Sequence, residues 1–522
     1  MLALHRWLPL FRREANPVAL RLVRQDLRSA ATTSTFLLLL VVCAGAAVIA
    51  ALAAGVQARP TTGAGLFLAV LWAWGFAAVV VQGLSVFRAV SQERQDDTWD
   101  LVELTGLSPG RVLRGLLIAH LANALMVASA LAPFAVMAYL LRGIDLAVIG
   151  FVLWAVPMAG LLAASLAVFT ATLTTGKALR TFLGGVLSLV LLGGWIMLCV
   201  ALSQSDGLGR FLGKLVHADS ESIFIMLIAL DAWLVVGGLC LTLGGSRLRH
   251  RADDRSSGPR SVALLVAINL ALWLPMTLAI LWLEHLSTGQ PWHDQVTECL
   301  GILPAILAVV GIIWAALVGW LGQAEDEALS PRQHRACVAG GRLRRAWMAI
   351  VGPGAVRARR WFLVVLAASL MFSLISLMVP LDPGGEDRMR RRVLIGAWLT
   401  AMSAATWLAV GDLLLRRTPL ARIFDTADLR RVAMLAILGL WSLLPVLLAW
   451  LIDPRHADSS VLLLCNPVWA PVRLAHEPES AGIIAVSVVG LLCIIWLYVR
   501  SRSAVEVIER VAARPDERNP RA

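Results

Sequence analysis

The chain has 522 residues, 59% of them hydrophobic, and a formal net charge of +12 at pH 7. Because soluble domains contain only about 45–50% apolar residues, this composition excludes an ordinary soluble protein. A basic surplus in a soluble protein would favour a nucleic-acid partner. Here the arginines cluster at the ends of long apolar runs, so no nucleic-acid partner is expected. Repeated runs of about 20 apolar residues predict an all-α polytopic protein embedded in a lipid bilayer.

Residues 1–33 form a basic N-terminal arm ahead of the first apolar run. Asn16 and Pro17 are suited to the N-cap and first turn of a helix. Beyond this cap, apolar and basic residues separate at helical spacing onto different faces. The apolar set is Leu20, Val23 and Leu27, and the basic set is Arg21, Arg24 and Arg28. This pattern favours an amphipathic helix lying on a membrane surface over a plain basic tail.

About twelve spans follow, in two groups of six. Residues 34–245 form the first six-span unit, a polar linker occupies 246–261, the second unit covers 262–500, and 501–522 form a tail. The predicted spans of the first unit are 34–57, 66–87, 112–140, 147–173, 181–203 and 223–243. Those of the second unit are 262–283, 300–321, 361–380, 393–415, 432–452 and 481–499.

The arginine distribution predicts the orientation of these spans. Twelve spans place both termini on one side, and the arm, the tail and alternate loops are rich in arginine, whereas loop 284–299 has no Lys or Arg. By the positive-inside rule, the arginine-rich side and both termini are cytoplasmic. One segment disagrees, because the RMRRR run of residues 388–392 falls on the predicted outside.

The two halves have the same layout of spans and loops, which predicts two six-helix repeats. Leu107-Ser108-Pro109, before the third span, is echoed by Leu329-Ser330-Pro331 at the corresponding junction of the second half.

No enzyme motif is present. The chain has no HExxH, GxSxG or GxxxxGK[ST] sequence, and the seven cysteines form no CxxC pair that would indicate a metal site. We therefore expect no catalytic residue, no metal and no cofactor in this chain, and any nucleotide-driven work must come from a partner.

Four polar residues fall inside predicted spans, namely Gln82, His120, Asn123 and Asp231. A charge such as Asp231 at mid-span costs about 2.5–3.5 kcal/mol on insertion scales, so it should face protein or water. Two interpretations are open. These residues line a polar path or coupling-ion site, or they make interhelical hydrogen bonds, which we favour.

The charged segment of residues 88–111 lies between the second and third spans. Gly106 suits the position just past a helix end, Ser108 suits the N-cap of the next helix, and Pro109 its first helical position. The segment thus predicts a short charged helix, a sharp turn and direct entry into the third span.

This segment resembles a signature of bacterial ABC transporter permeases of the type-2, exporter class. The resemblance is carried by Glu93-Arg94, Thr98, Leu101, Glu103 to Pro109 and Arg111, with Asn16-Pro17-Val18 ahead of an arginine-rich helix, and Pro133 before the turn at 142–145. It covers roughly residues 10–245.

The resemblance implies a permease of the bacterial inner membrane that exports a substrate while a separate cytoplasmic ATPase subunit binds the ATP. The residues that would contact this ATPase are Glu93, Arg94, Thr98, Trp99, Asp100 and Glu103. The second half has Glu325-Asp326-Glu327 in place of this pattern. The family usually works with two six-span units. Three arrangements are therefore open: one chain supplies both units, the chain pairs with a second copy as a homodimer, or the second half is regulatory.

Two alternatives belong to other functional classes. One is a membrane scaffold or assembly protein that binds partners through its loops. The other is an ion-coupled secondary transporter that works through Asp231 and His120 without an ATPase.

Overall fold

The computed structural model describes residues 16–56, 62–95, 109–141, 146–173, 177–203, 220–249, 253–288, 292–327, 329–338, 341–378, 385–424, 426–452, 466–476 and 480–512. These ranges are built of helices, with no strand among them. The predicted all-α class is therefore confirmed.

Twelve of the described helices are long and apolar enough to cross a membrane, which confirms the predicted polytopic membrane protein with about twelve spans. The first six are Thr32–Ala53, Gly63–Glu93, Pro109–Leu140, Val148–Leu173, Ala178–Val200 and Ile225–Arg247. The second six are Ser257–Trp282, Cys299–Gln323, Ala355–Leu377, Arg390–Arg417, Ala427–Ala449 and Ala481–Arg502.

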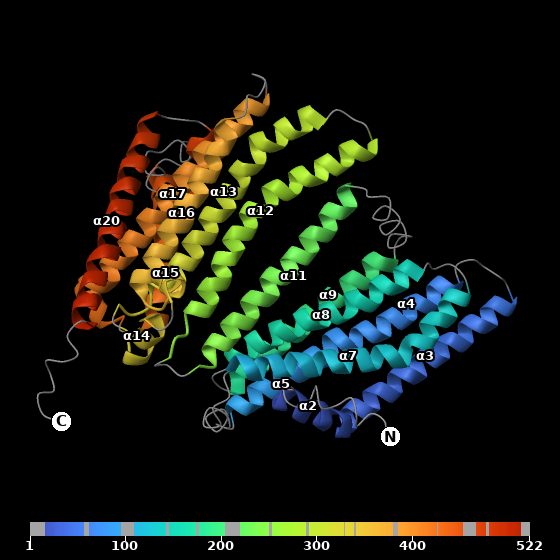
Figure 1. The fold of residues 1–522 in the computed structure, drawn as a ribbon. Helices are drawn as coiled ribbons and strands as arrows, with labels where there is room; N and C mark the ends of the chain where they lie inside the picture. Colours follow the sequence, from blue (N-terminus) through green and yellow to red (C-terminus); the bar gives the residue numbers. More distant parts are fainter. Residues whose placement is uncertain are drawn as a thin grey trace, which may run out of the picture. The chain divides into compact units, whose positions relative to one another are not determined.

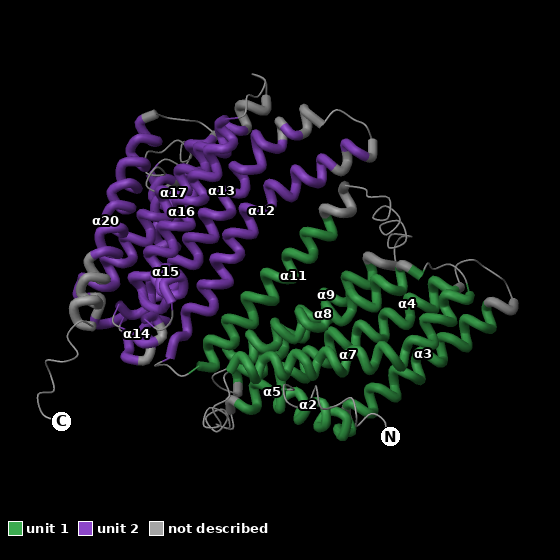
Figure 2. Tube along the Cα trace, viewed as in Figure 1, with its two compact units in different colours: residues 1–249 green, residues 250–522 purple. Residues whose placement is uncertain are grey.

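The contacts divide the chain into two compact units, Met1–Arg249 and His250–Ala522 (Figure 2). Each unit has its own hydrophobic core. The elements of unit 1 are α2 (Pro17–Arg28), α3 (Ala30–Val56), α4 (Thr62–Gly75), the π-helix η2 (Phe76–Val81), α5 (Gln82–Gln95), α7 (Pro109–Leu140), α8 (Leu146–Leu173), α9 (Lys177–Ser203) and α11 (Ser220–Arg247).

In unit 1 the fourth span, α8, is central and packs against α5, α7 and α11. Its contact surface is a stripe of small residues, Ala163, Ala167 and Ala171, each at most 2% exposed. Small side chains four residues apart let helix backbones approach closely, which is how spans associate in lipid. The amphipathic helix α2 lies beside α7 and leads directly to α3 (Figure 1).

Unit 2 has a matching set of helices. They are α12 (Ser257–Thr288), α13 (Trp292–Gln323), α14 (Pro331–Val338), α15 (Arg342–Val351), α16 (Ala355–Leu377), α17 (Gly385–Arg417), the 3-10 turn η3 (Pro419–Arg422), α18 (Ala427–Ile452), α19 (Trp469–His476) and α20 (Ser480–Ala512). The fourth span, α17, is again central, and its stripe Ala397, Ala401 and Ala405 is fully buried.

The helices pair in the same order in both units. The second span packs against the third (α4 on α7, α13 on α16) and against the fourth (α5 on α8, α13 on α17). The fourth span packs against the sixth (α8 on α11, α17 on α20). This internal arrangement is what a duplicated six-span unit would produce.

Local details refine several sequence predictions. Asn16 caps α2 with Pro17 in its first turn, and α7 begins at Pro109, as predicted. The predicted loop around residues 388–392 is instead the start of α17. Arg390 donates to the carbonyl oxygen of Ser376 at the end of α16, 3.1 Å away. A carbonyl that has no helical partner at a helix end is satisfied in this way.

Candidate functional site

The junction between α2 and α7 joins the N-terminal arm to the helix that follows the charged segment 88–111. The Asn16 side chain accepts from the amide of Val18 and donates to the carbonyl oxygen of Arg111 in the first turn of α7. The two helices touch at Gly115, where a Cβ atom would lie 2.9 Å from both Asn16 and Val18. Only glycine permits this close approach without displacing a neighbour.

A second link lies two turns further along. Asn123 of α7 donates to a carboxylate oxygen of Asp26 of α2 at 2.6 Å. Burial raises the pKa of Asp26, and the hydrogen bond from Asn123 partly opposes that rise. The structure thus uses Asn123, a predicted polar-path residue, in an interhelical hydrogen bond. Its partner Asp26 was not predicted, although it is the one acidic residue among the arginines of α2.

The predicted ATPase-contacting residues begin at the end of α5. Glu93 is partly buried, and the charge of Arg21 on α2 attracts its carboxylate. Arg94 belongs to the last turn of α5, but its side chain lies outside the described part of the chain. Thr98, Trp99, Asp100 and Glu103 also lie outside the described residues.

A group of buried polar atoms surrounds the π-helix η2 in the second span. Four of them have no hydrogen-bond partner among the described residues, and they are Trp74 Nε1, Gln82 Oε1, His120 Nε2 and Trp195 Nε1. Trp74 and Gln82 flank η2 in sequence, and Trp195 packs on Gly75 at its start. Neither tryptophan was predicted as part of a polar site, because tryptophans of membrane spans are usually interfacial anchors.

His120 points between η2 and α8. A Cβ atom at Gly160 would lie 3.0 Å from His120 Nε2 and 3.2 Å from the carbonyl oxygen of Ala78. A buried polar group without a partner costs about 1–3 kcal/mol, and π-helices are frequent at functional sites. Gln82 and His120, predicted as path residues, therefore both border η2, where the helix hydrogen-bonding pattern is irregular.

Asp231 lies apart from this group on α11. Its side chain is partly exposed, and two residues later Trp233 donates to the carbonyl oxygen of Met158 on α8 at 2.7 Å. The four predicted path residues are thus divided among three locations. Gln82 and His120 border η2, Asn123 binds α2, and Asp231 is partly exposed on α11, two residues before the contact of Trp233 with α8.

In unit 2 an arginine cluster holds the loop between α13 and α14. Each residue of the acidic triplet is paired with arginines from other helices. Glu325 binds Arg260 of α12 at 2.8 Å, and Asp326 binds Arg430 of α18 at 2.8 Å. Glu327 binds Arg359 of α16 at 2.6 Å, Arg416 of α17 at 3.6 Å and Arg500 of α20 at 3.4 Å. One short loop therefore connects five spans.

The cluster continues into the interior of unit 2. Arg359, only 2% exposed, also pairs at 2.5 Å with Asp412, which is equally buried. Burial by itself raises the pKa of Glu327, but the hydrogen bond and charge of Arg359, together with Arg416 and Arg500, lower it below its usual value. Asp412 also pairs with Arg416, one turn later on α17, at 3.0 Å.

The echoed Leu-Ser-Pro motif of unit 2 opens α14. Ser330 Oγ accepts from the amide of Gln333 at 3.2 Å, and the Gln333 side chain accepts from the amide of Ser330 at 3.0 Å. This reciprocal pair is a capping box, and Pro331 occupies the first helical position. Unlike α7, α14 ends after eight residues, so here the motif starts a short helix and not a span.

Comparison of the chain with protein-family models, with curated proteins and with solved structures finds no match. Within the described ranges, no three His, Cys, Asp or Glu side chains gather closely enough to hold a metal ion.

Proposed function

We propose that this chain is the membrane-spanning permease of an ABC exporter in a bacterial inner membrane, driven by a separate cytoplasmic ATPase subunit. The proposal rests on the sequence resemblance carried by the charged segment 88–111 and on one structural observation. The helix that this segment enters, α7, is fastened to α2 through Asn16–Arg111 and Asp26–Asn123. A force applied to the segment would therefore move α2 and α7 together.

Such a force has a route into unit 1. The segment joins the end of α5 to the start of α7, and α5 packs on the central helix α8. Between α4 and α5 the π-helix η2 interrupts the regular hydrogen bonding of the second span. We propose that the second span bends at η2 as the permease alternates between inward-open and outward-open forms. Gln82 Oε1 and His120 Nε2, which have no hydrogen-bond partner among the described residues, would gain polar contacts there in one of the two forms.

Unit 2 would play a different part. The acidic triplet of its corresponding loop is paired with five arginines, so its carboxylates are already occupied. We propose that unit 1 binds the ATPase, whereas unit 2 binds none and forms a static half of the pathway. A second ATPase would then require a second copy of the chain.

The test is purification of the tagged chain from its native host in mild detergent, with ATPase activity measured on the eluate. We expect an ATPase to co-purify with the wild type and to be lost from a Glu93→Arg/Trp99→Ala variant. A matched control, Asp428→Arg, reverses an 85% exposed charge of unit 2 and should retain the ATPase. If no ATPase accompanies any of the three proteins, the proposal is wrong.

The same preparation separates the alternatives. Transport that needs no ATPase and is lost in Asp231→Asn would indicate an ion-coupled carrier. A scaffold protein would keep its activity in Asp231→Asn and in Glu93→Arg/Trp99→Ala.

A further inference from the structure

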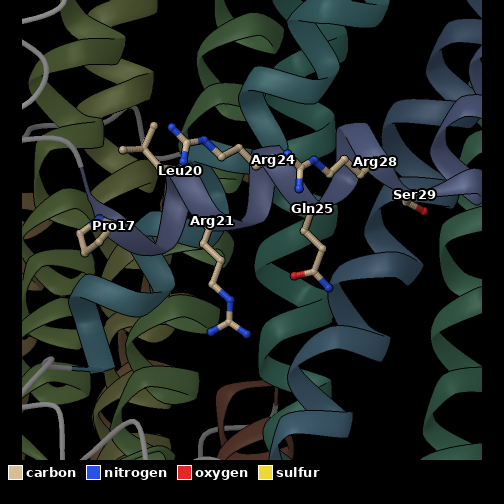
Figure 3. Close-up of a pocket in the computed structure, with 7 residues that line it drawn as sticks. All are labelled: Pro17, Leu20, Arg21, Arg24, Gln25, Arg28 and Ser29. Atoms are coloured by element: carbon tan, nitrogen blue, oxygen red, sulfur yellow. The ribbon is translucent and has the colours of Figure 1, made fainter.

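The face of α2 opposite α7 borders a hollow of about 840 Å³. Its described lining is Pro17, Leu20, Arg21, Arg24, Gln25, Arg28 and Ser29. In Figure 3, Arg21 and Gln25 extend from one edge of this face, and Leu20 and Arg24 from the other. The three arginines are exposed, whereas Ala19 and Asp26, on the far side of the helix, are turned toward α7.

The position of the hollow relative to the bilayer follows from the chain. Helix α2 ends at Arg28, Ser29 breaks the helix with an extended backbone, and the first span begins at Thr32. Thr32 is four positions after Arg28, a separation of about 6 Å along a helix and at most about 14 Å if extended. The headgroup layer on each side of the hydrocarbon core is about 5–8 Å thick. Arg28 and Ser29 therefore lie at the level of the lipid phosphates.

The side chains of this face are suited to a ligand that has both an anionic group and an apolar part. Arginine binds phosphate through paired N–H donors. The single acidic residue of α2, Asp26, is turned away toward Asn123 and does not neutralise this face. Beside the arginines, Leu20 is 47% and Leu27 51% exposed. These side chains offer an apolar surface to acyl chains at the level where the arginines meet the headgroups.

We propose that this hollow binds the headgroup of an anionic phospholipid, with Arg24 and Arg28 holding its phosphate and with Gln25 and Ser29 as neutral hydrogen-bonding groups. Arg21 also faces Glu93 at the end of α5, so it lies between the lipid and the segment that leads to α7. The lipid would thus sit beside the α2–α7 junction. This inference does not depend on the proposed transport function, because the chain itself forms the site.

The test is native mass spectrometry of the detergent-purified chain titrated with phosphatidylglycerol or with phosphatidylcholine. We expect preferential retention of phosphatidylglycerol and a loss of that preference in Arg24→Gln/Arg28→Gln. At about 1 kcal/mol for each basic residue near the surface, two substitutions weaken binding roughly 30-fold. The control Arg417→Gln/Arg422→Gln removes two exposed arginines of unit 2 and should bind like the wild type.

Several results would overturn the proposal. Equal retention of both lipids, or unchanged retention by the α2 variant, would show that the hollow is not a headgroup site. Displacement of the lipid by inorganic phosphate at equal concentration would indicate a site for soluble anions. Normal lipid retention with loss of the co-purifying ATPase would identify the face as a protein-docking surface. A size-exclusion profile that matches the wild type establishes that the double variant Arg24→Gln/Arg28→Gln is folded. If the double variant does not fold, the single variant Arg28→Gln is tested in its place.

Discussion

The absence of a side chain at Gly160 leaves room for the imidazole of His120 in the interior of unit 1. The imidazole Nε2 lies where a Cβ atom of residue 160 would approach to 3.0 Å, with the carbonyl oxygen of Ala78 beside it. Because both α8 and η2 present backbone at this point, neither can give way as a flexible side chain would. The buried histidine is therefore accommodated by glycine, and this packing is set by contacts between α7, α8 and η2.

Gly160→Ala should therefore destabilise the protein. Overpacking a filled interior costs about 1–3 kcal/mol, and we expect a lower melting temperature for the detergent-purified variant. Gly150→Ala on the same helix is the matched control, because nothing lies within 4 Å of its added Cβ. Alanine has the higher helix propensity, so this control should melt at or slightly above the wild-type temperature. Equal melting of both variants would show that the site is loosely packed.

At the scale of elements, the loop between α13 and α14 is held more firmly than its sequence indicates. The triplet Glu325-Asp326-Glu327 has the composition of a solvated acidic turn. In the structure its arginine partners come from α12, α16, α17, α18 and α20. Removing one partner of a buried ion pair leaves the other charge uncompensated, whereas replacing both by apolar residues is often neutral or stabilising.

Arg359→Leu should consequently be far more damaging than Arg359→Leu/Asp412→Leu. The single variant leaves Asp412 buried with Arg416 as its remaining partner, at a cost of about 3 kcal/mol. We expect a large drop in melting temperature and yield, followed by partial recovery in the double variant. Failure of the second substitution to restore any stability would mean that Arg359 acts mainly through Glu327, which it also binds.

The second span shows the limit of prediction for single elements. An apolar run with a following charged segment predicts a continuous α-helix, and hydropathy alone contains no signal for the π-helix at Phe76–Val81. π-helices are rare and occur mostly as single-turn bulges inside α-helices. Here α8 and α9 both pack against η2.

At the scale of the whole molecule, each six-span unit is built around its fourth span, α8 in unit 1 and α17 in unit 2. The stripes on α8 and α17 occupy equivalent places in the two units, and each allows several neighbours to approach one helix closely. Without a hydrophobic driving force between spans in lipid, this close packing supplies much of the association energy.

Ala167→Leu and Ala401→Leu should therefore have similar effects, one in each unit. Both alanines are fully buried, and a leucine would force the central helix away from its neighbours. We expect aggregation or loss of a monodisperse size-exclusion peak for both variants. Ala178→Leu, at an exposed position of α9, is the control. If only one of the two stripe variants aggregates, the two units do not depend on the same packing around their fourth spans.

Hydropathy and local backbone chemistry are enough to predict the class of the protein and the order of its helices. Apolar runs must be buried in lipid as helices, so the twelve spans follow from hydropathy, and Asn16, Pro17 and Pro109 set helix starts through local backbone chemistry. The polar contacts between helices, in contrast, could not be predicted from the order of residues. Asp26 and Asn123 are 97 residues apart, and the partners of Glu327 come from three helices. Such contacts depend on which faces of the helices pack together, because residues distant in sequence become neighbours only after the bundle has formed.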